Sequence, residues 1–191
     1  MSPRLCLVLG GVRSGKSAFA ESKALEFNQT VGQTTLYVAT GVAFDKEMKD
    51  RILRHKGSRP QEWCTLEEPV KLADEISSFL QKSENTGVVI IDSIDVWVAN
   101  LLMEHQTEDS HTQEKLVIGE ADKLLRLMAG ASQAFVLVSS EVGLSLVSPE
   151  PLGRRFQDLL GTVNQWIAST ATEVYLIVAG IPVTLKSSST E

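Results

Sequence analysis

The sequence has little of what disulfide frameworks, zinc sites and membrane spans require. Its 191 residues include two cysteines, Cys6 and Cys64, too few for a disulfide framework and not spaced in pairs as zinc ligands are. The apolar run near the start, residues 5–9, ends at Gly10 and is too short for a signal peptide or a membrane span. We therefore expect a cytoplasmic protein with no membrane span.

An excess of basic residues is also missing. The formal net charge is −6, whereas a general nucleic-acid binder usually carries a basic face, so no nucleic-acid partner is expected. The hydrophobic fraction of 43% and the charged fraction of 22% are ordinary for a globular protein. The length suits one well-buried core better than two.

Short β-rich apolar runs alternate with longer amphipathic stretches, a pattern typical of an α/β protein whose sheet is covered on both faces. Strands are predicted at residues 5–9, 35–38, 88–91, 134–138 and 174–178, with a last edge strand at 183–185. Helices are predicted at residues 16–27, 46–56, 69–80, 96–104, 113–128 and 152–168. Helical crossovers imply mostly parallel strands. We expect residues 1–186 to form a single domain and residues 187–191 a disordered tail.

A phosphate-binding motif follows the first predicted strand. Gly10, Gly15, Lys16 and Ser17 satisfy the pattern G-x-x-x-x-G-K-[ST], and a helical pattern begins directly after it. Glycines let backbone N–H groups converge on phosphate oxygens, the lysine reaches the β- and γ-phosphates, and the serine hydroxyl binds Mg²⁺. The sequence therefore predicts a P-loop NTPase fold. The predicted nucleotide-binding residues of the loop are Gly10, Gly11, Val12, Arg13, Ser14, Gly15, Lys16 and Ser17.

Asp92 is the candidate acidic partner of Mg²⁺, because it ends the apolar run 88–91 as the second acidic element of such sites does. Two alternatives stay open. Asp92 would also serve as the N-cap of the helix that follows, and Asp95 would also supply a carboxylate for the metal ion.

The segment 45–59 is basic in an acidic chain, with six Lys and Arg side chains against three acidic ones. In a helix, Arg51 and His55 share one face. Neighbouring cations disfavour imidazolium, so His55 would stay neutral and nucleophilic, and a neutral imidazole facing a phosphate is able to form a covalent phosphoramidate. A solvated basic surface with an incidental histidine is the alternative.

Several segments in order resemble the bifunctional adenosylcobinamide kinase / adenosylcobinamide-phosphate guanylyltransferase family of cobalamin biosynthesis. Besides the P-loop they include Tyr37–Thr40, His55 with Lys56 and Arg59, Trp63–Pro69, Asp92–Trp97 with Asn100, Ser140–Gly143, Arg154–Asp158, Gly161–Gln165 and Gly180–Lys186. The resemblance implies phosphorylation of adenosylcobinamide by ATP or GTP, followed by transfer of GMP from GTP through a covalent guanylyl-histidine at His55.

The resemblance also implies a RecA-like fold with helices on both faces of the sheet, a homotrimer, and further residues that contact nucleotide. Mg²⁺ would be held by Ser17 and Asp92, and His55 and Lys16 would be catalytic. The further nucleotide contacts are Ala39, Thr40, Gly41, Lys56, Gly57, Ser58, Arg59, Glu67 and Asp92.

The chain departs from the usual family pattern at Asp95, Ser140, Ser145 and Ser148, which bears on the corrinoid side of the site. Glu141 beside them is either a substrate contact or an acid at a helix start. Two other functions also fit a P-loop: another small-molecule kinase, or a regulatory ATPase that uses nucleotide as a switch.

Overall fold

One seven-stranded sheet organises the chain. The computed structural model describes residues 4–28, 33–42 and 60–187. The strand order is β3-β2-β4-β5-β1-β6-β7, parallel throughout except where β7 pairs antiparallel with β6. The strands are β1 (Leu5–Gly10), β2 (Thr34–Ala39), β3 (Cys64–Glu67), β4 (Thr86–Asp92), β5 (Ala134–Ser140), β6 (Glu173–Val178) and β7 (Ile181–Lys186).

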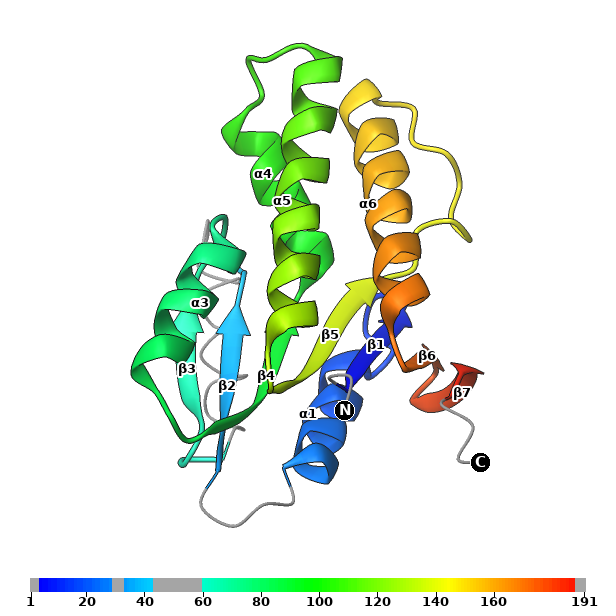
Figure 1. Ribbon diagram of the computed structural model, residues 1–191. Helices are drawn as coiled ribbons and strands as arrows, with labels where there is room; N and C mark the ends of the chain where they lie inside the picture. Colours follow the sequence, from blue (N-terminus) through cyan, green and yellow to red (C-terminus); the bar gives the residue numbers. More distant parts are fainter. Residues whose placement is uncertain (1–3, 29–32, 43–59, 188–191) are drawn as a thin grey trace.

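The described helices cover the two faces of the sheet unequally. Figure 1 shows α3, α4, α5 and α6 on one face and α1 on the other. The helices are α1 (Lys16–Phe27), α3 (Leu72–Lys82), α4 (Ile94–Glu104), α5 (Ser110–Gly130) and α6 (Pro151–Thr170). Among the described residues, none of the helices is both long and apolar enough to cross a membrane.

Side chains of the central strands alternate between two cores, as period-2 geometry requires. In β1, Leu5, Leu7 and Leu9 join the core under α3–α6, whereas Cys6 and Val8 pack on the α1 side. Because both faces are covered, these strands read in the sequence as continuous apolar runs. That property made the central strands predictable.

The structure adds one strand that was not predicted and shifts several predicted boundaries by two or more residues. Strand β3 was missed because its four residues are alternately half-buried and exposed at the sheet edge, and so give no apolar run. The helix predicted from residue 69 begins at Leu72, since Glu68 accepts hydrogen bonds from the backbone N–H groups of Val70 (2.7 Å) and Lys71 (2.6 Å). Helix α5 begins at Ser110 instead of residue 113, because Asp109 caps it. The predicted helix 46–56 lies outside the described residues.

A charged cluster ties β6 to β1 and α1 at the amino ends of the strands. The buried Glu173 carboxylate accepts hydrogen bonds from Lys23 Nζ (2.9 Å), Arg4 Nη2 (3.1 Å) and the Tyr175 hydroxyl (2.9 Å). Burial alone would raise the pKa of Glu173, but these hydrogen bonds outweigh it and hold the pKa below its ordinary value. Burial, reinforced by the same carboxylate, raises the pKa of the neighbouring Cys6 thiol to about 12, so Cys6 stays protonated and unreactive.

Replacing Glu173 with glutamine is expected to lower the free energy of unfolding by about 1–3 kcal/mol at neutral pH, because it breaks a buried ion pair. A carboxyl with a lowered folded-state pKa stabilises the fold above its unfolded pKa, and that stabilisation is lost as pH falls through the folded value. Urea denaturation at pH 7 and near pH 3 should therefore show a smaller acid-induced loss in E173Q than in the unmodified chain. Arg126→Ala, which breaks the exposed pair with Asp122 (2.8 Å), is the control and should cost less than about 0.5 kcal/mol.

Candidate active site

Strand register brings the predicted nucleotide residues of the described chain to one edge of the sheet. Ala39 lies opposite both Glu67 and Asp92, Asp92 lies opposite Val138, and Gly10 lies opposite Ser140. The carboxyl ends of β3, β2, β4, β5 and β1 therefore follow one another along this edge. In open α/β sheets, ligands bind at this end of the strands.

The loop between β1 and α1 has backbone geometry that depends on its glycines. A Cβ on Gly10 would lie 2.6 Å from Ser14 Oγ and 2.7 Å from the carbonyl oxygen of Ile177, so any larger residue would displace the loop. Gly15 has a φ of 98° and forms the N-cap of α1, a conformation that glycine adopts readily. The loop is anchored to the β6–β7 turn, because Gly180 N donates to the Ser14 carbonyl at 2.9 Å.

Lys16 and Ser17 stand in the first turn of α1, where backbone N–H groups and the helix dipole favour an anion. Lys16 Nζ donates to the carbonyl oxygen of Gly11 at 2.9 Å, which folds the side chain back over the loop. Val12 and Arg13 are in the middle of the loop. Val12 has 83% of its surface exposed, and Arg13 has a φ of 56°. The predicted strand–loop–helix arrangement of the motif is confirmed.

Asp92 is the last residue of β4 and so lies at the same edge. Tyr37, buried in β2, donates its hydroxyl to Asp92 Oδ2 at 2.5 Å. The N-cap alternative for Asp92 is wrong, because α4 begins at Ile94 and its N-cap is Ser93. Asp92 is thus half-buried and oriented by a tyrosine, with no part in capping a helix.

Thr40 and Asn100 lock the ends of β2 and β4 together. The buried Thr40 hydroxyl accepts from Ser93 N at 2.7 Å and donates to the Ser93 carbonyl at 2.8 Å. Asn100 Nδ2 donates to the carbonyls of Thr40 (2.9 Å) and Pro69 (3.1 Å). Thr40 therefore positions the backbone beside Asp92, and Gly41 follows it half-buried at the sheet edge.

The end of β5 carries a second polar group of contacts. Ser140 Oγ donates to Asp95 Oδ2 at 2.6 Å, so two positions that depart from the family pattern are hydrogen-bonded to each other. Asn164 of α6 accepts from Ser139 Oγ (2.7 Å) and donates to the Ser140 carbonyl (3.1 Å). Glu141 lies in the loop after β5, and its carboxylate accepts from Gly143 N at 2.6 Å. The next helix, α6, begins only at Pro151 and has Glu150 as its N-cap, so the helix-start alternative for Glu141 is wrong.

Part of the predicted site lies outside the described residues, namely His55, Lys56, Gly57, Ser58 and Arg59. Sequence reasoning assigned no role to Tyr37 or Asn100, which orient Asp92 and Thr40. Both residues could have been found in the sequence, because each is a polar side chain at a position where the repeat of the strand or helix predicts burial. Buried polar side chains need hydrogen-bond partners.

A glycine-rich loop that joins a buried parallel strand to a helix, with an oriented aspartate at the same sheet edge, defines a P-loop nucleotide-binding protein. Residues 6–185 match the family model described as cobinamide kinase / cobinamide phosphate guanyltransferase. The chain belongs to this family, and it is a bifunctional kinase and guanylyltransferase. The alternatives of an unrelated small-molecule kinase or a regulatory switch are thereby set aside.

Individual relatives agree with the family match. A bifunctional adenosylcobalamin biosynthesis protein, CobP of Pseudomonas aeruginosa, is 38% identical over 180 residues, covering 94% of this chain and 96% of that protein. CobU of Escherichia coli, of the same description, is 35% identical over 188 residues, covering 95% and 99%. Among solved structures, an ATPase domain has a TM-score of 0.57 at 9% identity, covering 97% of this chain and 78% of that one, and this likeness confirms the RecA-like α/β fold alone.

Proposed function

We propose that the kinase reaction takes place on the loop Gly10–Ser17, with adenosylcobinamide as the acceptor and ATP or GTP as the donor. The observation that carries the proposal is the strand register, which sets this loop and Asp92 at one sheet edge. Backbone N–H groups of the loop and the Lys16 ammonium would stabilise the charge that develops on the transferred phosphoryl group. The acceptor hydroxyl attacks the γ-phosphorus, and the nucleoside diphosphate leaves.

Ser17 and Asp92 are the proposed protein ligands of Mg²⁺. Hydroxyl and carboxylate oxygens are the donors that Mg²⁺ prefers, and it commonly takes one or two carboxylates together with substrate phosphates. Strand β5 lies between β1 and β4, so the ends of β1 and β4 are about 10 Å apart at ordinary strand spacing. That gap leaves room for a phosphate and a hydrated ion, and the Tyr37 hydroxyl fixes the position of the Asp92 carboxylate. Bound Mg²⁺ would neutralise charge on the nucleotide phosphates.

For the second reaction we propose His55 as the nucleophile. Its imidazole nitrogen attacks the α-phosphorus of GTP, a P–N bond forms, the bond to the β-phosphate oxygen breaks, and pyrophosphate leaves. A phosphate oxygen of adenosylcobinamide phosphate then attacks the same phosphorus and releases the imidazole, giving adenosylcobinamide-GDP. The support is the family membership together with the basic sequence around His55, whose cations would keep the imidazole neutral. Lys56–Arg59, Ala39–Gly41 and Glu67 are the proposed further nucleotide contacts.

We also propose the pathway, oligomeric state, location and domain extent of the chain. The chain would act in cobalamin biosynthesis as a homotrimer, as the family resemblance implies. A cytoplasmic location is supported by the free thiols of Cys6 and Cys64, which suit a reducing compartment. Residues 1–186 would form one domain, supported by the single sheet that spans the described residues.

Removing Mg²⁺ with a chelator is expected to abolish both reactions, and adding Mg²⁺ back should restore them. Asp92→Asn should lower kcat/KM of the kinase reaction by about 10²-fold, because a neutral amide would hold Mg²⁺ less well, and the charge of Mg²⁺ would stabilise the transferred phosphoryl group. The measurement is the mass of the corrinoid product, which gains a phosphoryl group with ATP and then a guanylyl group with GTP. Asp74→Asn, an exposed change on α3, is the matched control, and equal effects of the two variants would contradict the assignment.

A further inference from the structure

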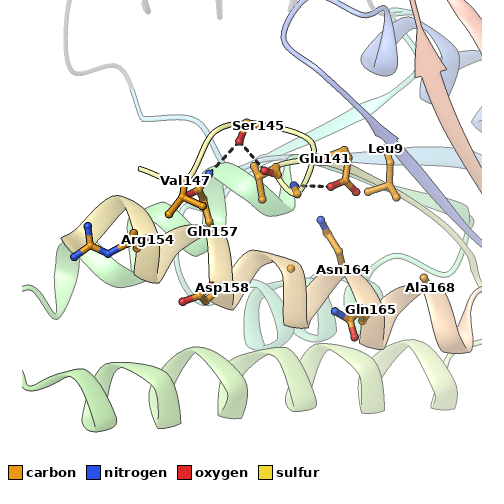
Figure 2. A pocket seen from close by; sticks show the side chains of 13 residues that line it. Leu9, Glu141, Ser145, Val147, Arg154, Gln157, Asp158, Asn164, Gln165 and Ala168 are labelled. Carbon is orange, nitrogen blue, oxygen red and sulfur yellow. Dashed lines mark hydrogen bonds between the residues drawn. The ribbon is translucent and has the colours of Figure 1, made fainter. Parts of the chain in front are cut away.

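A cavity of about 630 Å³ lies between α6 and residues 141–150, which we call the β5–α6 loop. Its lining includes Glu141, Val147, Arg154, Asp158, Gly161 and Gln165. Figure 2 shows the loop arching over α6, with Gln157 reaching from the helix to Ser145. Three segments singled out in the sequence but unused by nucleotide chemistry, residues 140–143, 154–158 and 161–165, meet here.

The cavity is lined by the two residues that join it to the start of the phosphate-binding loop, Leu9 and Glu141. Leu9, the residue before Gly10, lines it, and Glu141 N donates to the Gly10 carbonyl at 3.3 Å. A molecule in the cavity therefore lies beside the loop that would hold the triphosphate. This is where the acceptor of a phosphoryl transfer must be placed for close approach to the phosphate.

Two side chains of α6 fix the β5–α6 loop by hydrogen bonds. Gln157 donates to Ser145 Oγ (3.0 Å) and the Leu146 carbonyl (3.1 Å), and accepts from Ser148 N (2.9 Å). Arg154 Nη1 donates to the carbonyls of Ser148 (3.1 Å) and Pro149 (2.6 Å). With both side chains engaged in supporting the loop, Asp158 and Gln165 are the exposed polar groups of the helix that line the cavity.

The same loop carries exposed apolar side chains. Leu144, Leu146 and Val147 are 85%, 93% and 76% exposed, and Val147 also lines the cavity. Exposed apolar groups beside a cavity lined by both polar and apolar side chains indicate a binding site for a ligand with both characters.

We propose that this cavity is the acceptor site of the kinase, which rests on the function proposed above. Cobinamide combines a large apolar macrocycle, peripheral primary amides and a hydroxyl-bearing arm. A cavity of 630 Å³ suits the arm and adjacent amides, with Asp158 and Gln165 hydrogen-bonding the amides. The macrocycle, too large to enter, lies against Leu144, Leu146 and Val147.

Gly161 offers a way to fill the cavity without disturbing the fold. It lies within α6, lines the cavity, and a Cβ built on it meets no atom within 4 Å. Replacing a glycine inside a helix removes an intrinsic cost of up to about 1 kcal/mol. Gly119 of α5 also has open space around its Cβ and is not among the residues lining the cavity, so Gly119→Phe is the matched control.

Gly161→Phe is expected to raise KM for cobinamide at least about tenfold in the kinase assay, the lower end of what a single misfitting group costs in a pocket. KM for ATP, the melting temperature and GTP-dependent protein labelling should stay unchanged. Gly119→Phe should change none of these. An unchanged KM for cobinamide in Gly161→Phe would overturn the proposal, and so would a change of oligomeric state in solution with KM unaffected. If Gly161→Phe fails to fold, Asp158→Leu carries the same prediction.

The test separates this proposal from the proposed function. GTP-dependent labelling needs no acceptor, so its absence in the unmodified chain would overturn the histidine mechanism and leave the cobinamide KM comparison valid.

Discussion

Replacing Lys16 with alanine is expected to lower kcat/KM for cobinamide phosphorylation by about 10²–10³-fold, the usual cost of removing one group that stabilises transition-state charge. Lys16 opens α1 at the loop, and its ammonium lies 2.9 Å from the Gly11 carbonyl. A short movement would bring it from this oxygen to the β- and γ-phosphates. Radiolabelled phosphate transfer from ATP to cobinamide measures the effect.

The matched control for Lys16 is Lys115→Ala, an exposed lysine in α5, which should retain activity within about twofold because solvated surface charges contribute little. Circular dichroism and thermal unfolding should be the same for both variants, since Lys16 lies outside the two hydrophobic cores that hold the sheet and helices together. Phosphorylation at an undiminished rate in Lys16→Ala would show that the loop does not hold the reacting triphosphate.

Replacing His55 with alanine is expected to separate the two reactions. Guanylyl transfer should fall by at least about 10³-fold, because removing a covalent nucleophile leaves only binding and charge stabilisation. Phosphorylation should persist within about threefold, since Lys16, Ser17 and Asp92 are untouched. Cobinamide phosphate should then accumulate when the variant is supplied with both ATP and GTP, as chromatography of the corrinoid products would show.

His111→Ala is the control for this separation, because His111 is an exposed residue in the first turn of α5. It should leave both reactions unchanged. Equal loss of the two reactions in His55→Ala would contradict the division of labour, since it would indicate that His55 supports nucleotide binding in general.

The central sheet was predictable from the sequence because its strands are buried on both faces. Apolar runs such as 88–91 and 134–138 predicted β4 and β5 correctly, although each strand extends beyond its run. Strand β3 was not predictable because its pairing with β2, and not its own burial, defines it. The antiparallel β7 was predicted as an edge strand, but all six of its residues are exposed and so carry no signal of its full length.

The site was predictable where chemistry fixes residue spacing and unpredictable where the tertiary fold alone sets the contacts. Gly10–Ser17 follow a pattern that phosphate binding imposes on consecutive residues. The bond from Tyr37 to Asp92 joins residues 55 positions apart, and only the register of β2 on β4 reveals it. The hydrogen bond from Ser140 to Asp95 likewise joins residues 45 positions apart, and only the fold brings them together.

We propose that the chain carries out two transfers: a phosphoryl transfer on the loop after β1, and a guanylyl transfer through His55. The measurement that tests this most directly is the intact mass of the chain after incubation with Mg-GTP and denaturation. We predict a mass increase of one guanylyl group that acid removes, that His55→Ala abolishes and that His111→Ala retains. Absence of any such adduct, while the same preparation still converts cobinamide phosphate to its GDP derivative, would contradict it.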